Sequence, residues 1–241
     1  MNRFWAIAAA LAPWPAAAQD APQFEASVVS DDRRRGLSWS DGRAAAQLRL
    51  DAPLPAGFDA SLRAATARGA ARHGDADAAL DLRLGYRRDS GLWRLEAGAV
   101  AHTFAGGRGD QDFWEVEAGA GVTVGPLDLA LLAAVAPRQQ AIGGSNFYRR
   151  ARLRSGVPGT PMTLSAHLGR STGSRRDPTR TGRLRPDGNY YDWALGADYA
   201  LGKATLSLTY SDTDIDGASA NAAGTGRHSG ATLVAGAHVA F

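Results

Sequence analysis

Three arginines stand at alternate positions in one short segment of the chain: Arg150, Arg152 and Arg154. Side chains two residues apart in a β-strand point to the same face, so the three guanidinium groups are expected to form a row. Such a row on the wall of a channel creates a positive potential that attracts anionic solutes. The spacing therefore predicts a stretch of pore wall with a preference for anions.

Further charged residues are expected to line the same interior, because they too alternate with apolar residues. The bases are Arg33, Arg49, Arg63, Arg83 and Arg94, and the acids are Asp81, Glu96, Glu115, Glu117, Asp128, Asp192 and Asp198. Two interpretations are open at this point. In the first, the arginines line an open passage for small solutes. In the second, they pair with the acids and cross-link a filled interior.

The five histidines do not form a recognisable catalytic motif. A lipid hydrolase would need a serine paired with a histidine near the outer rim, and an acid or amide to orient the histidine. Neither a G-x-S-x-G nor an H-E-x-x-H motif occurs. His102 and His167 are predicted to face the interior, His73 and His228 to lie in or beside loops, and His238 to lie on the periplasmic side. We therefore predict no enzymatic activity, with a lipid hydrolase as the weaker alternative.

The segment from Asp212 to Gly217 imitates the start of a calcium loop, with oxygen-bearing side chains at its first, third and fifth positions. Position twelve is Ala223, where such loops carry a glutamate that binds the ion with both oxygens. This pattern predicts an acidic surface loop and no metal site. We expect no other cofactor.

Strands must position these residues, and the closing segment 229–241 shows their pattern most clearly. Every second residue from Ala231 to Phe241 is apolar, which is the period of a strand with one apolar face. The segment is long enough for a tilted membrane-crossing strand, and an aromatic end suits the membrane interface. The pattern recurs at 24–28, 46–50, 58–64, 78–86, 93–101, 114–122, 127–135, 147–155, 162–168, 191–199 and 205–210. Segment 61–72 is Ala-rich, so a helix is the alternative there.

The connections between these segments alternate in length. Longer, more charged connections occur at 31–43, 68–77, 105–112, 137–146, 170–188 and 212–227, and shorter ones near Pro53, Ser90, Pro126, Pro158 and Gly202. An even strand number with both termini on the short-turn side is typical of an outer-membrane β-barrel. A soluble sandwich has no reason to separate its loops in this way. In the predicted register Arg149 faces lipid, near the loop-side interface where a long side chain can reach water.

The N-terminus and the composition agree with an exported protein. A basic start, an apolar run from Phe4 to Ala18 and a small-residue site at 16–18 predict a cleaved signal peptide over 1–18, followed by a barrel over 19–241. The absence of cysteine excludes disulfides. The net charge is +3, with 27 basic and 24 acidic residues, and the arginines are dispersed, so no nucleic-acid partner is predicted.

Segment 30–47 resembles the first hairpin of the TorF porin family, whose pattern is S-D-aromatic-x-aromatic-R-G-hydrophobic-S-Q-S-D-G. The residues that match family motifs are Ser30, Asp31, Arg35, Gly36, Ser38, Ser40, Asp41, Gly42, Asp192, Trp193, Asp212, Asp214 and Phe241. Asp32 and Arg34 replace the usual aromatics, and Trp39 replaces the usual Gln. The resemblance implies an outer-membrane channel whose solute is undefined.

These observations together predict an all-β protein: one antiparallel transmembrane barrel of about twelve strands in the bacterial outer membrane. The predicted function is passive diffusion of small hydrophilic, anion-leaning solutes, and a closed structural barrel is the alternative. The predicted partners are outer-membrane lipid, lipopolysaccharide, small solutes and the barrel-insertion machinery. That machinery would recognise the last strand through Phe241, whose place at the chain end is similar to the insertion signal of such barrels.

Overall fold

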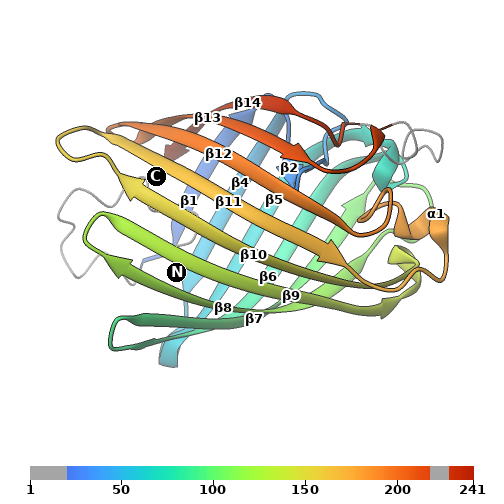
Figure 1. The fold of residues 1–241 in the computed structure, drawn as a ribbon, viewed down its shortest axis with the longest axis horizontal. Helices are drawn as coiled ribbons and strands as arrows, with labels where there is room; N and C mark the ends of the chain where they lie inside the picture. The colour runs from blue at the N-terminus through green and yellow to red at the C-terminus, as the bar shows by residue number, and fades with distance from the viewer. Residues whose placement is uncertain (1–20, 218–227) are drawn as a thin grey trace.

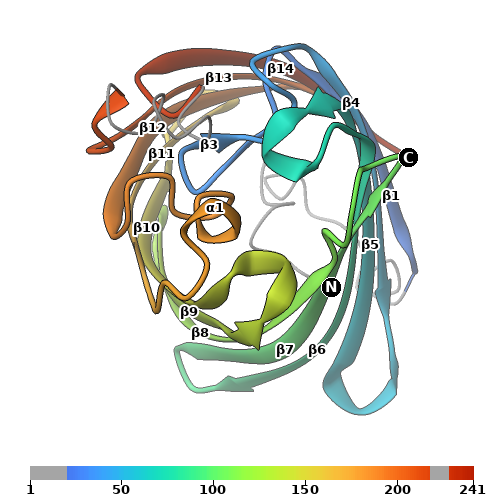
Figure 2. The same ribbon diagram turned by 90° about the vertical axis from the view of Figure 1, so that its right-hand side faces the viewer.

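A computed structural model describes residues 21–217 and 228–241 of the chain. Within these ranges a closed barrel of twelve antiparallel strands forms, which confirms the predicted fold class and strand number. The first strand, β1 (Gln23–Val29), pairs with β4 (Ala45–Pro53) on one side and with the last strand, β14 (Thr232–Ala240), on the other. This pairing closes the cylinder seen in Figures 1 and 2. The predicted signal peptide lies outside the described residues and stays a prediction.

The remaining wall strands follow in chain order, each hydrogen-bonded to the next. They are β5 (Phe58–Ala70), β6 (Ala76–Ser90), β7 (Trp93–Ala105), β8 (Phe113–Val124), β9 (Leu127–Gln139), β10 (Gly144–Gly156), β11 (Met162–Thr172), β12 (Tyr190–Leu201) and β13 (Ala204–Thr213). Among the described residues, no helix is both long and apolar enough to cross a bilayer.

The Ala-rich segment 61–72 is a strand over most of its length, because β5 continues to Ala70. Over residues 61–65 the segment is paired with β4 on one side and β6 on the other, and this pairing outweighs the helical propensity of alanine. Ala65 and Ala67 are buried on the inward face. The pairing with β6 shifts in register between Thr66 and Ala70.

Short turns join the strands at the end of the barrel where β1 begins and β14 ends (Figure 1). Three of them have only two residues and start with a glycine at positive φ: Gly91 at 60°, Gly125 at 56° and Gly202 at 63°. This conformation matches the twist of a hairpin and is costly for a side chain with a Cβ. A 3-10 turn, η3 (Pro55–Gly57), makes the first connection at this end.

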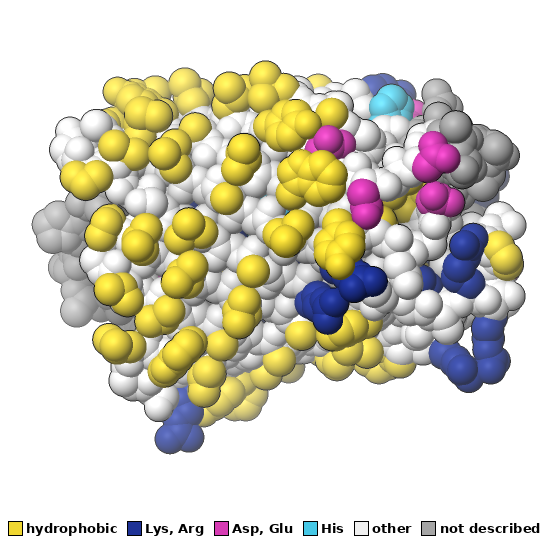
Figure 3. Space-filling model, in the orientation of Figure 1, with side chains coloured by type: hydrophobic (Ala, Val, Ile, Leu, Met, Phe, Trp, Pro, Cys, Tyr) yellow, Lys and Arg dark blue, Asp and Glu magenta, His cyan; other side chains and the backbone are white. Residues whose placement is uncertain are grey.

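The outer face of the barrel is an apolar band (Figure 3). Leucines at alternate positions are highly exposed, among them Leu84 at 55%, Leu131 at 60% and Leu195 at 61%. Exposed aromatic residues border the band on both sides. Those toward the short turns are Phe24, Phe58, Tyr86, Trp93, Tyr199 and Phe241, and those toward the loops are Trp114, Phe147, Tyr191 and Tyr210. Such a pattern matches the lipid-facing surface and interfacial girdles of transmembrane barrels.

The opposite end carries the long connections and their short elements. These elements are β2 (Arg33–Arg34), β3 (Leu37–Ser38), η4 (Ala71–His73), η5 (Gln140–Ile142) and α1 (Pro178–Thr181). Figure 2, which looks into this end, shows η4, η5 and α1 lying over the opening, with β3 beside them. The buried apolar residues Trp39, Phe113, Ile142 and Leu184 form a small core there. The loop elements therefore narrow the loop end of the barrel.

Candidate functional site

The first long connection folds into a hairpin, β2–β3, which its own polar side chains hold together. The Asp31 carboxylate accepts hydrogen bonds from Ser38 Oγ at 2.5 Å, Ser40 Oγ at 3.0 Å and Arg33 Nε at 2.9 Å. Ser38 Oγ in turn accepts a bond from the Gly42 amide at 2.8 Å. Residues matched to the family pattern therefore stabilise the hairpin through hydrogen bonds within it.

The tip of this hairpin requires a glycine. Arg35 and Gly36 both have positive φ, at 53° and 74°. A Cβ on Gly36 would lie 3.1 Å from the Asp192 Cβ and would clash with the Thr213 methyl group. The tip therefore packs directly against the inner side of β12 and β13. Tyr190 Oη donates to the carbonyl oxygen of Arg35 at 2.9 Å, which fixes the tip further.

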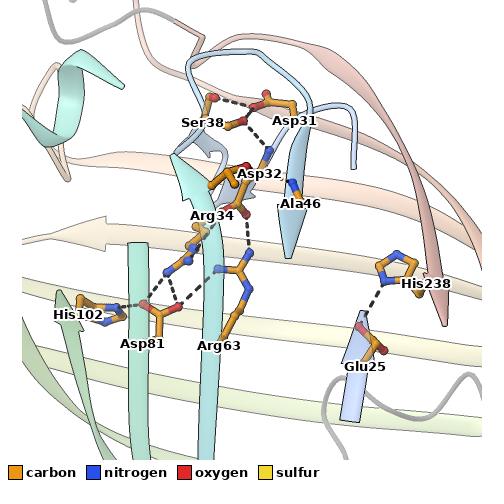
Figure 4. Close-up of polar contacts among 12 residues, drawn as sticks. Glu25, Asp31, Asp32, Arg34, Ser38, Ala46, Arg63, Asp81, His102 and His238 are labelled. Carbon is orange, nitrogen blue, oxygen red and sulfur yellow. Dashed lines mark hydrogen bonds and ion pairs between the residues drawn. The ribbon is translucent and has the colours of Figure 1, made fainter. Parts of the chain in front are cut away.

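Charged groups join the hairpin to the opposite wall (Figure 4). Arg34 lies 2.7 Å from Asp81 on β6, and Arg63 on β5 lies 2.8 Å from Asp32. Asp81 also lies 2.7 Å from His102 Nδ1. Burial raises the pKa of Asp32, an effect that Arg63 opposes. Within the same cluster, Arg35 pairs with Glu115 on β8. The hairpin is thus bound to several strands by ion pairs.

Trp39 connects the hairpin to the apolar core of the mouth. The Arg34 guanidinium lies 3.8 Å from the centre of its ring, and the rings of His73 and Phe104 lie at 4.4 Å and 5.4 Å. The cavity lined by Arg34, Arg35, Trp39 and other hairpin and wall residues has a volume of about 50 Å³. Such a space holds only a few water molecules.

Two buried arginines link η4 to the loop that follows α1. Arg183 donates to the carbonyl oxygens of Ala141 at 2.6 Å and Arg72 at 3.1 Å, and Arg72 donates to that of Arg183 at 2.9 Å. Burial lowers the pKa of each arginine to about 10. Burial also lowers the pKa of His73 well below its ordinary value, and the charges of Arg183 and Arg72 add to this effect. His73 is therefore neutral at pH 7.

Toward the short turns, the predicted interior arginines lie among carboxylates. Arg83 has Asp59 and Glu117 each at 2.5 Å. The other pairs are Arg94–Asp128 at 2.9 Å, Arg94–Glu96 at 3.6 Å and Arg49–Asp51 at 2.6 Å. Ion pairs therefore join β6 to β5 and β8, and β7 to β9, while the other pairs lie within a single strand.

The arginine row on β10 lies on the inward face. Arg152 and Arg154 are each 8% exposed, and Arg150 is half-buried. Asp128 on β9 lies 3.5 Å from Arg152, and Asp198 on β12 lies 3.1 Å from Arg154. The row of guanidinium groups thus lies beside carboxylates of β9 and β12 on this part of the wall.

The structure places the predicted lining residues at inward positions of their strands. They are Arg49, Arg63, Arg83, Arg94, Glu96, Glu115, Glu117, Arg150, Arg152 and Arg154. Their role in a pore stays a prediction. Arg33, also expected in the interior, lies in the hairpin and bonds to Asp31 and the Gly230 carbonyl oxygen. Arg149 is exposed on the outer face.

Sequence reasoning missed the entry of the hairpin into the barrel, because the charge of segment 31–43 indicates no more than a loop. A signal for it exists in the inward residues near the loop end, which are small. Ala65, Ala67, Ala79, Ala134, Ala136 and Ala194 are all buried. Small side chains there leave the space that the hairpin occupies.

Inside the barrel, a serine, a histidine and a carboxylate contact one another, although no hydrolase motif in the sequence predicts this arrangement. Ser207 Oγ lies 3.1 Å from His238 Nε2, and His238 Nδ1 lies 3.4 Å from Glu25. A hydrolase would also need free donors for the oxyanion. The three residues lie on paired strands whose backbone amides belong to the sheet. This arrangement therefore lacks the donors that acyl transfer requires from the backbone.

The carboxylates of Asp212 and Asp214, in the acidic segment after Tyr210, accept hydrogen bonds from other protein groups. Asp212 accepts from Tyr210 Oη at 3.0 Å, and Asp214 accepts from the Tyr191 amide at 2.6 Å. No cluster of potential ligands that could hold a metal ion is present in the described part of the chain. Ala223 lies outside the described residues.

Comparisons with known proteins agree with this architecture. No curated protein matches the sequence. The KdgM porin structure superimposes with a TM-score of 0.59 at 8% identity, covering 91% of this chain and 99% of that one. The NanC porin gives 0.57 at 12% identity, with coverages of 92% and 99%. LpxR from Salmonella typhimurium gives 0.51 at 11% identity, with coverages of 91% and 99%.

At sequence identities this low, the structural matches show a shared fold and nothing more. A family match is more specific, because it rests on the sequence itself. Residues 17–240 match the family described as "Bacterial protein of unknown function (Gcw_chp)", which spans nearly the whole chain. The chain therefore belongs to the Gcw_chp family of bacterial proteins.

Proposed function

We propose that this protein is a porin of the bacterial outer membrane that passes small hydrophilic solutes by passive diffusion. The observation that carries the proposal is a closed twelve-stranded cylinder with an apolar outer band and a charged inner wall. Water-filled barrels of the outer membrane have this distribution of side chains. The folds of the KdgM and NanC porins are similar to that of this chain. Membership of the TorF porin family is part of the same proposal.

A modest preference for anions is proposed from the wall at β10, where Arg150, Arg152 and Arg154 form a row on the inward face. The similar KdgM porin has a structure in complex with disordered oligogalacturonate, which is an anion. The ion pairs elsewhere on the inner wall reduce the net field, so the expected selectivity is small.

A closed structural barrel is the second candidate, and the β2–β3 hairpin favours it. The hairpin and the loop core narrow the mouth, and the cavity between hairpin and wall has a volume of about 50 Å³. In the porin proposal this hairpin is the constriction that limits conductance. The two candidates differ in whether the hairpin leaves a continuous path for ions.

Planar-bilayer conductance separates the candidates. The full chain is compared with a double variant, Arg35→Ala with Trp39→Ala, which removes the ion pair to Glu115 and the packing of Trp39 in the mouth. Arg87→Ala is a matched control, because Arg87 pairs with Asp89 near the short turns. We expect discrete steps from the wild type and larger steps from the double variant.

Absence of discrete steps in both proteins would overturn the porin and leave the closed barrel. A reversal potential that indicates cation preference would overturn the anion argument alone. Release of fatty acid from lipid by the purified protein would instead support the hydrolase alternative.

The proposed outer-membrane location is consistent with the surroundings of the Phe241 side chain. Phe241 is 69% exposed, and its ring packs 5.6 Å from that of Phe24 in the turn-side aromatic border. A terminal aromatic side chain on an exposed last strand is available to the insertion machinery before the barrel closes. Deleting Phe241 should therefore lower the amount of folded barrel in cells more than it lowers refolding in detergent.

A further inference from the structure

Two arginines lie side by side on the outer, lipid-facing surface of the barrel. Arg149 on β10 and Arg170 on β11 are direct partners in the antiparallel register. Both share their face with exposed leucines, because Leu153 and Leu168 lie on the same sides of their strands. Figure 3 shows basic side chains against the apolar band, toward the loop end. Like charges directly opposite one another destabilise a sheet.

Neither guanidinium group has an acidic partner among the residues that the structure describes. No carboxylate there lies within ion-pair distance of Arg149 or Arg170, and Arg170 Nε is buried without a hydrogen-bond partner. Two acids near the loop end of the adjacent strands, Asp212 and Asp214, accept bonds from Tyr210 and the Tyr191 amide. The two positive charges therefore lack an anion from the described part of the chain.

Aromatic side chains place this pair at the membrane boundary. Arg170 lies over the Tyr191 ring with its Cζ atom 4.8 Å from the ring centre, and Tyr191 belongs to the loop-side aromatic border. Phe147, two residues before Arg149, belongs to the same border. In transmembrane barrels such borders lie at the level of the lipid headgroups. Further out, the exposed Arg175 and Arg176 continue the basic surface into the loop after β11.

From these contacts we infer that Arg149 and Arg170 form a binding site for a phosphate group of lipid A in the outer leaflet. Guanidinium groups bind phosphate oxygens through paired, charge-assisted hydrogen bonds, and two of them supply enough donors to surround one phosphate. The Tyr191 ring keeps Arg170 in place, and the exposed leucines below the pair supply a surface for acyl chains. The inference rests on the proposed outer-membrane location.

Native mass spectrometry of the detergent-solubilised full chain tests the site. The probes are bis-phosphorylated lipid A, lipid A from which both phosphates have been removed, and inorganic phosphate. We expect retention of the first only, with binding that weakens as salt is raised. Equal retention of both lipids would overturn the site, because acyl contacts alone would then explain binding. Equal binding of inorganic phosphate would show an anion site without lipid specificity and would also overturn it.

Variants locate the site on the barrel. Arg149→Gln with Arg170→Gln should lower the affinity for lipid A about a hundredfold, about tenfold for each arginine, which corresponds to about 1.4 kcal/mol each. Arg88→Gln is the matched control, because Arg88 on β6 is also an exposed arginine on the outer surface, but it lies near the short turns. An unchanged affinity in the double variant, or an equal loss in the control, would overturn the assignment.

The heat-dependent gel mobility of each variant reports whether its barrel has folded. If the double variant fails to fold, the single variants and the comparison of phosphorylated with dephosphorylated lipid still decide the question. Binding does not require conductance, so a silent barrel that retains lipid A would reject the porin proposal without rejecting the site.

Discussion

The two faces of β10 hold arginines in opposite surroundings. On the inner face, Arg152 and Arg154 lie near Asp128 and Asp198. On the outer face, Arg149 has only another arginine, Arg170, as its cross-strand partner on β11. One strand thus places the same side chain in a compensated interior and on an uncompensated surface.

The contrast is between inner arginines that have carboxylate partners on the wall and an outer pair that has no carboxylate partner among the described residues. Inside the barrel, the ion pairs of Arg83 join β6 to β5 and to β8. At the outer rim, the headgroup region of the membrane is the nearest source of negative charge. Each of the following predictions changes one side of this comparison.

The largest loss is expected from removing an arginine that compensates two acids. Arg83→Ala leaves the buried Asp59 and the half-buried Glu117 without their shared cation. Breaking a buried ion pair in this way costs about 3–5 kcal/mol. Urea unfolding in lipid vesicles measures the change in unfolding free energy. Arg87→Ala, whose partner Asp89 is exposed, should change it much less, and equal losses would show that the inner pairs are not the stabilising ones.

A new arginine on the outer face should cost less, and its cost should depend on depth. Leu153→Arg places a charge four residues further along β10 than Arg149, inside the apolar band. Arginine near the bilayer midplane destabilises a barrel by about 2–4 kcal/mol. In vesicles without lipid A, Arg149→Leu should be neutral or stabilising. If Leu153→Arg were as well tolerated as the native Arg149, the assigned membrane boundary would be wrong.

A smaller effect is expected from pH at the mouth. Because the folded state keeps the pKa of His73 well below its ordinary value of 6.5, only the unfolded chain takes up this proton as the pH falls. The folded mouth should therefore lose stability below about pH 6.5, by at most about 1.4 kcal/mol per pH unit. Asp32, whose pKa is raised, acts in the opposite direction. His73→Phe removes the histidine contribution, so the difference between variant and wild type across pH 5–7 measures it; no difference would refute this origin.

The smallest change is expected at Ser207. Ser207→Ala removes the hydroxyl group that contacts His238, at a site where hydrolysis lacks backbone oxyanion donors. Conductance should be unchanged, and the unfolding free energy should stay within about 0.5 kcal/mol of the wild type, as for most substitutions away from a packed core. Fatty-acid release that depended on Ser207 would contradict this and establish an enzyme.

The strands could be predicted because each carries its own signal. In β10 the alternation of Phe147, Ala151 and Leu153 with Arg152 and Arg154 sets both the strand and the face that meets lipid. A slip by one residue would move the arginines into hydrocarbon, so local sequence fixes the register. The same alternation is enough to predict that Arg149 lies on the outer face.

The position of the β2–β3 hairpin inside the mouth of the barrel could not be predicted in this way. Asp31, Ser38 and Gly36 look like ordinary loop residues in sequence, since nothing local says whether a polar hairpin turns outward or inward. The structure shows that Gly36 packs against Asp192, more than 150 residues later in the chain. Contacts between residues so distant in sequence depend on how the strands close into a cylinder.

By itself, the sequence determined that this chain forms an even-numbered barrel with an apolar outside, because alternation with period two acts on every strand independently. Only the tertiary structure decided which arginines are paired with acids and which are not. Ring closure brings Arg63 to Asp32 and Arg35 to Glu115 across the interior, whereas the pairing of β10 with β11 sets Arg149 beside Arg170 on the outside. Electrostatic energy depends on such distances, and the spacing of residues along the chain does not contain them.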